Sequence, residues 1–157
     1  MNSKLKGHFM DIAVFSSLLY GLEHCAIGAR DQRCLDGYFF CLAKRVLHLR
    51  YDYRLSYEEA ENRLGIQPPS IRLRRDRLRW IGHVLRSEET ILQEVLHFVP
   101  TGGARNRGRL RLRNYNTLKS DMKERGIIIT ANKQTLFWEA VKGLASNREQ
   151  WRRIGMS

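Results

Sequence analysis

Cysteine and histidine, the side chains that bind zinc in proteins, recur at a regular interval in the first third of the chain. Cys34, Cys41 and His48 follow one another every seven residues. On a helix this interval places the side chains two turns apart, about 10 Å, which is too far for them to share one ion. We therefore interpret them as small residues on the buried stripe of a helix, and we expect neither a metal site nor a cofactor.

Acidic side chains that could act in catalysis cluster once, at Glu58, Glu59 and Glu61. Ser56 precedes them, and a serine followed three residues later by glutamate is a capping box that begins a helix. The sequence has no adjacent pair of aspartates for a two-metal polymerase site, and it has no P-loop or G-x-S-x-G motif. We therefore expect no catalytic residues in this chain, which would then not be an enzyme.

Cationic side chains form the strongest pattern, in the stretch SIRLRRDRLRWIGHVLR at 70–86. On a helical wheel they fall within an arc of about 80°. This basic stripe comprises Arg72, Arg75, Arg79, His83 and Arg86. Apolar residues cover roughly the opposite half. A charged face is usually only solvated, but like charges three or four residues apart destabilise a helix, so the stripe favours a polyanionic ligand.

A second cationic segment, TGGARNRGRLRLR at 101–113, has an arginine at every second position of its latter part. These arginines are Arg105, Arg107, Arg109, Arg111 and Arg113. Its glycines allow close approach to a nucleic-acid backbone, and the guanidinium groups can contact phosphates. A disordered basic linker is the alternative interpretation, although the interspersed Leu110 and Leu112 indicate some packing.

The bulk composition also indicates an acidic partner. The 157 residues, enough for one domain or two very small ones, carry a formal net charge of +12. Residues 69–113 contribute 11 arginines against four acidic residues, so more than half of this charge lies in under a third of the chain. We expect RNA or DNA, bound through phosphates, in preference to an anionic membrane. Three cysteines fit a reducing intracellular compartment, nucleus or cytoplasm, and the apolar run at 12–20 is too short to span a bilayer.

Hydrophobic periodicity predicts the elements that would position these residues. The fold class is mainly α, a compact helical domain of about six or seven helices. Residues 88–98 fit either helix or strand, so a minor strand pair around 95–113 is an alternative. The helices are expected at 4–20, 31–49, 56–64, 70–86, 114–125, 130–144 and 147–154, with Gly21, Gly65 and Gly126 as helix ends.

An ordered series of segments resembles the C-terminal, thumb and post-thumb region of non-LTR (LINE-type) retrotransposon reverse transcriptases. RLRWIGHVLR at 77–86 is similar to a signature of that family. Other segments occupy the corresponding places: LLYG (18–21), AKRVLHL (43–49), LSYEEAENRLG (55–65), GGARNRGRLRLRNY (102–115) and NREQWRRI (147–154). The resemblance covers nearly the whole chain from about residue 14.

The chain also departs from the family pattern. It has LEHC at 22–25 where the family usually has Ser-Glu-Thr-Trp, and Leu110, Tyr115 and Asn147 replace the usual proline, tryptophan and aspartate. The family's palm, with its paired aspartates, lies upstream and has no counterpart here. The resemblance implies a region that holds template and primer, with a helix at 1–25 that would abut the missing palm and a helical C-terminal domain at 26–157.

We therefore interpret the chain as a non-catalytic, weakly sequence-specific nucleic-acid-binding domain. One alternative is a protein-interaction or scaffold fragment that needs an upstream polymerase domain, suggested by the broad apolar face at 9–19. Another is a relic reading frame without selected function. A helix-turn-helix regulator built from 56–86 is disfavoured, because Pro68-Pro69 is not the usual tight turn.

Overall fold

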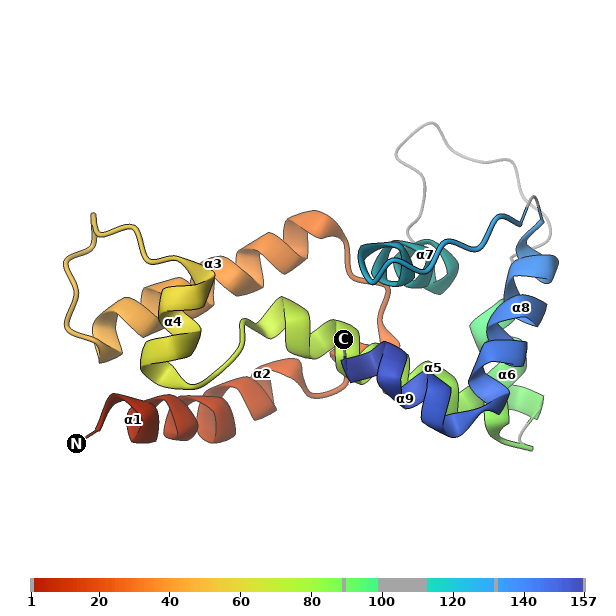
Figure 1. Ribbon diagram of the computed structural model, residues 1–157, viewed down its shortest axis with the longest axis horizontal. Helices are drawn as coiled ribbons and strands as arrows, with labels where there is room; N and C mark the ends of the chain where they lie inside the picture. The colour runs from red at the N-terminus through yellow and green to blue at the C-terminus, as the bar shows by residue number, and fades with distance from the viewer. Residues whose placement is uncertain (1, 89, 99–112, 132, 157) are drawn as a thin grey trace. The chain divides into compact units, whose positions relative to one another are not determined.

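The computed structural model of the chain describes residues 2–88, 90–98, 113–131 and 133–156 (Figure 1). About 75% of the described residues are helical, and these residues contain no strand. The mainly α prediction is confirmed. The alternative of a strand beginning at residue 95 is wrong, because 95–97 belong to α6 (Thr90–His97). Residues 99–112 lie outside the described ranges.

The helices form two compact units. Unit 1 comprises residues 1–23 and 27–74, and unit 2 comprises 24–26 and 75–157. Helix α5 (Pro69–Arg86) contributes its beginning to unit 1 and the remainder to unit 2. Contacts group residues 1–23 with 27–74, whereas the sequence-based division separated 1–25 from the rest.

Unit 1 begins with a continuous helical run made of α1 (Ser3–Met10), a π-helical segment η1 (Asp11–Phe15) and α2 (Ser16–Leu19). Helices α3 (Ala29–Val46) and α4 (Tyr57–Leu64) complete it with the beginning of α5. Phe15, Phe39 and Leu64 lie in its core. Helix α1 approaches the end of α4 so closely that a Cβ on Gly7 would lie 2.9 Å from the carbonyl carbon of Leu64.

Local sequence signals and one long-range contact set the helix ends in unit 1. The backbone N–H of Glu59 donates to the Ser56 hydroxyl at 3.1 Å, as the capping box predicts. Gly65 ends α4 with φ 70°. The start of α5 depends on α3 instead: Asp36, which is buried, accepts hydrogen bonds from the Ser70 backbone N–H at 3.1 Å and from the Ser70 hydroxyl at 2.7 Å.

Unit 2 packs the rest of α5 with α6, α7 (Asn114–Glu124), α8 (Gln134–Ser146) and α9 (Arg148–Met156). A short 3₁₀ turn at Leu22–His24 joins α2 to the segment before α3. The buried core of unit 2 includes Leu78, Ile81, Phe137 and Trp138. Trp138 and Trp151 are buried. Trp80 is partly buried, with its ring centroid 4.8 Å from that of His24.

The expectation that Cys34, Cys41 and His48 lie on the buried stripe of a helix is wrong. Cys34 and Cys41 are exposed on α3, and His48 is exposed beyond the end of that helix at Val46. The side chains that α3 buries are instead Asp36, Phe39 and Ala43.

None of the helices in the described ranges combines the length and the apolar character that crossing a membrane requires.

Candidate nucleic-acid interface

The first arginine of the basic stripe has a partner within unit 1. Arg72 donates to the Asp11 carboxylate at 2.5 Å and to the Ser16 hydroxyl at 3.4 Å. Both partners belong to the π-helical region at η1 and α2, where Ser16 also donates to the Asp11 carbonyl. Arg72 therefore ties α5 to the N-terminal run, and an anion would have to compete with Asp11 for it.

The next two arginines share one acid. Asp76 lies 3.5 Å from Arg75 Nε and 3.7 Å from a terminal nitrogen of Arg79. The Arg79 side chain remains 76% exposed, so this surface ion pair is weak and leaves the guanidinium accessible. His83 is also exposed, one turn further along the same face of α5.

The last arginine of the stripe is held beside another arginine. Arg86 donates to the Ala145 carbonyl at the end of α8, at 2.9 Å. Partial burial lowers the Arg86 pKa, and the nearby positive charge of Arg148 lowers it further. Neither guanidinium pairs with a carboxylate of the described residues. The fold thus places two like charges together without neutralising them.

Helix α9 runs antiparallel to the second half of α5 (Figure 1). The Trp151 indole N–H donates to the Leu78 carbonyl at 2.8 Å, while Arg148 lies near Arg86 further along α5. A Cβ on Gly82 would lie 2.5 Å from Cδ1 of Trp151, so only glycine permits this crossing. The tryptophan of NREQWRRI and the glycine of RLRWIGHVLR therefore form one contact.

This packing adds two arginines that the sequence analysis did not select. Arg148 and Arg152 are both exposed and lie one turn apart on the same face of α9. Their four-residue spacing is visible in the sequence and indicates a shared helix face. The packing of α9 against α5, which brings them to the basic stripe, is not visible in the sequence. We define the basic ridge as five exposed basic residues of these two helices: Arg79, His83, Arg86, Arg148 and Arg152.

Arg77 has a structural role instead. Its side chain is 1% exposed and forms a 2.5 Å ion pair with Asp121 of α7, which is 2% exposed. Its sequence position was a usable signal, since Arg77 falls in the apolar half of the helical wheel, where a cation needs a buried counter-ion.

Only one arginine of the second cationic segment is described. The carbonyl of Arg113 accepts hydrogen bonds from the Asn116 and Thr117 backbone N–H groups at the start of α7. Arg105, Arg107, Arg109 and Arg111 lie outside the described residues.

The acidic cluster on α4 is used in local contacts. Glu59 accepts hydrogen bonds from the Tyr53 hydroxyl at 2.9 Å and from Arg63 at 2.9 Å. Within the described ranges, no group of three histidine, cysteine, aspartate or glutamate side chains is arranged to hold a metal ion.

No protein-family model matches the sequence, and no curated protein or solved structure is significantly similar to it.

Proposed function

We propose that unit 2 binds RNA or DNA through its phosphates, without catalysing a reaction, and that the basic ridge is the contact surface. Unit 2 contains 17 lysines and arginines against eight acidic residues, a formal net charge of +9. Unit 1 contains 11 against eight, a net charge of +3. The proposal keeps the arginines of 101–113 as a second contact and an intracellular location, in the nucleus or cytoplasm.

The observation that carries the proposal is the pair Arg86 and Arg148. Two guanidinium groups without an intervening carboxylate repel each other. Partial burial lowers the Arg86 pKa, and the positive charge of Arg148 lowers it further. A phosphate between them would remove the repulsion and accept hydrogen bonds from both planar groups. The Arg86 hydrogen bond to Ala145 orients one of the groups before a ligand arrives.

The size of the ridge suits a backbone contact. Arg79 and Arg86 are seven residues apart on α5, about 10 Å along the helix axis, and Arg148 and Arg152 are about 6 Å apart. Phosphates recur every 3.4 Å of axis per strand, so the ridge would span a few phosphates.

The resemblance to the C-terminal region of LINE-type reverse transcriptases supports the same function. In that interpretation the partner of the ridge is template or primer, and a polymerase palm in cis or in trans is a further partner. The paired aspartates of the palm would then belong to that other domain.

The salt dependence of binding tests the proposal. The full chain would be titrated into a labelled duplex DNA and a labelled single-stranded RNA over a range of salt concentrations. The four ridge arginines should contribute about −3 to −4 to the slope of log Kobs against log salt on the duplex, and contacts from the arginines of 101–113 would add to it. The double variant Arg86→Gln/Arg148→Gln should reduce this slope by about 2.

A matched variant separates the ridge from net charge. Arg30→Gln/Arg33→Gln removes the same charge from exposed positions of α3 in unit 1. It should leave the affinity and the slope close to those of the natural chain. Equal losses for the two double variants, or an affinity that is insensitive to salt, would contradict the proposal.

A further inference from the structure

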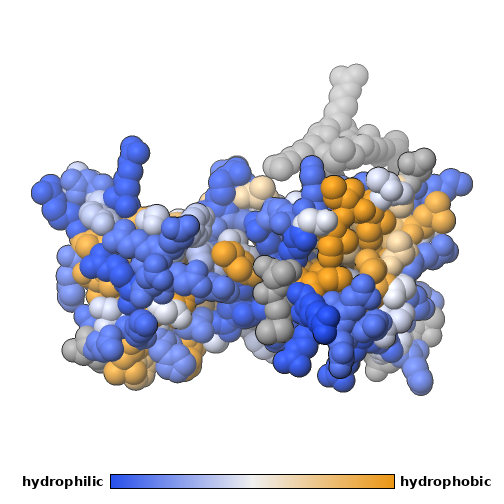
Figure 2. Space-filling model, viewed as in Figure 1, coloured by the Kyte–Doolittle hydropathy of each residue, from blue (hydrophilic) through white to orange (hydrophobic). Residues whose placement is uncertain are grey.

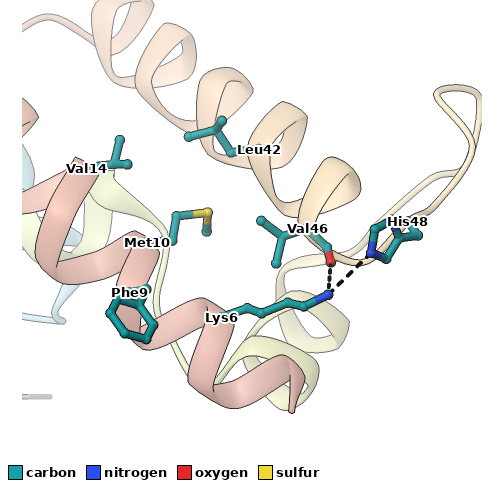
Figure 3. Close-up of a pocket in the computed structure, with 7 residues that line it drawn as sticks. All are labelled: Lys6, Phe9, Met10, Val14, Leu42, Val46 and His48. Carbon is teal, nitrogen blue, oxygen red and sulfur yellow. Dashed lines mark hydrogen bonds between the residues drawn. The ribbon is translucent and has the colours of Figure 1, made fainter. Parts of the chain in front are cut away.

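An apolar groove in unit 1 is not used by the nucleic-acid binding proposed above. It lies between α1 and α3 and has a volume of about 480 Å³ (Figure 3). Its apolar walls are formed by Phe9, Met10, Val14, Leu42 and Val46. The side chains come from both helices, so the groove is a feature of their packing rather than of one helix.

One end of the groove is cationic. Lys6 Nζ donates to the Val46 carbonyl at 3.3 Å and lies 3.3 Å from Nε2 of His48 (Figure 3). His48 has a left-handed backbone, with φ 55°, and its backbone N–H donates to the Arg45 carbonyl. Because the Leu49 N–H also bonds the Lys44 carbonyl, this helix end is a Schellman motif that fixes His48 beside Lys6.

The apolar surface continues beyond the groove along α1 and into η1. Leu5, Phe9 and Ile12 are 47%, 59% and 56% exposed, at helical positions i, i+4 and i+7. Figure 2 shows hydrophobic surface at this edge of the unit, over α1. A row of large apolar side chains beside a groove is the arrangement with which proteins receive a partner's amphipathic helix.

We propose that this surface binds an amphipathic helix of a partner protein that carries acidic residues next to its apolar face. Apolar side chains of the partner would occupy the groove and contact Phe9. An acidic residue at one end of the partner helix would face Lys6 and His48. This contact would fix the direction in which the partner helix lies in the groove. A symmetric contact with a second copy is disfavoured, because Lys4, Lys6 and His8 of the two α1 helices would meet each other.

The test uses the full chain and two synthetic helical peptides. Both carry leucine at positions i, i+3, i+4 and i+7. One has flanking glutamates and the other has lysines at the same places. Binding would be followed by fluorescence anisotropy and by amide chemical shifts of the labelled chain. The acidic peptide should bind at least about tenfold more tightly, with the largest shifts around the groove.

Two exposed apolar positions provide a variant and its control. Phe9→Ser should weaken binding of the acidic peptide about tenfold or more. Ile128→Ser removes an apolar side chain that is 72% exposed in unit 2 and should leave binding unchanged. Circular dichroism would confirm that both variants remain folded.

Four results would overturn the proposal. These are equal affinity for the two peptides, unchanged binding by Phe9→Ser, a dimer in sedimentation that Phe9→Ser dissociates, and attachment of the same surface to anionic vesicles in place of the peptide. None of these experiments involves nucleic acid, so the groove and the basic ridge are tested separately.

Discussion

Gly82 is the position where one methyl group should disturb unit 2 most clearly. In Gly82→Ala the new Cβ would lie 2.5 Å from Cδ1 and 2.9 Å from Cε2 of Trp151, and closer still to Nε1. Carbon atoms of packed side chains are normally 3.5 to 4.0 Å apart, so the indole would have to move by about 1 Å. The movement would break the 2.8 Å hydrogen bond from Nε1 to the Leu78 carbonyl.

The expected free-energy change combines three effects. Overpacking a core contact costs about 1 to 3 kcal/mol. Loss of a buried hydrogen bond costs about 1 to 3 kcal/mol. The higher helix propensity of alanine stabilises the helix by at most about 1 kcal/mol, which offsets part of this loss. We therefore expect Gly82→Ala to lower the free energy of unfolding of unit 2 by about 3 kcal/mol, a decrease in Tm of about 15 °C.

Tryptophan fluorescence can measure this loss in unit 2 alone, because Trp80, Trp138 and Trp151 all belong to that unit. Urea titrations would give the midpoint and the m-value for each variant. A change of midpoint at constant m-value reports a change of stability without a change in the surface exposed on unfolding.

Gly143→Ala is the matched control. Gly143 lies in α8 of the same unit, and a Cβ there has no neighbour within 4 Å, so alanine should stabilise unit 2 by up to about 1 kcal/mol. In a Trp151→Ala background, Gly82→Ala should cost much less, because the ring atoms that clash are absent. Similar effects of Gly82→Ala and Gly143→Ala would refute the reasoning.

Two further predictions concern buried and partly buried charge in unit 2. Asp121→Ala leaves Arg77 buried without its counter-ion and should destabilise the unit by about 3 to 5 kcal/mol, whereas Arg77→Met/Asp121→Leu should recover most of that in the same urea titration. Burial, and secondarily the charge of Lys142, lowers the His97 pKa below 6.5. The unfolded chain therefore binds this proton more readily, and stability should fall as the pH drops below 6.5. His97→Gln should flatten this dependence between pH 7.5 and 5.5. Identical pH profiles of stability for the natural chain and His97→Gln would contradict the assignment.

Local signals in the sequence were sufficient to predict most helix ends. Gly21, Gly65 and Gly126 all have positive φ, as expected of glycines that terminate helices, and Ser56 caps α4. These features depend on residues a few positions apart, which a single sequence displays directly. Helix α5 begins at Pro69, one position before the predicted start at residue 70.

The roles of individual cations could not be predicted in this way. Arg72 contacts an aspartate 61 residues away, and Arg77 pairs with one 44 residues away. A helical wheel shows which residues share a face of one helix. It does not show which other helices pack against that face. The same reason explains why Arg148 was missed: its relation to Arg86 exists only once α9 has packed on α5.

The cap that Asp36 provides for α5 has a consequence for synthesis on the ribosome. Helix α5 takes this cap from a residue 34 positions upstream, and the Tyr57 hydroxyl also donates to the same carboxylate at 3.1 Å. Both groups are translated before Ser70. Because the ribosome releases the N-terminal part first, the Asp36 carboxylate is already present when α5 is made. The first turn of α5 can therefore be capped as soon as it forms.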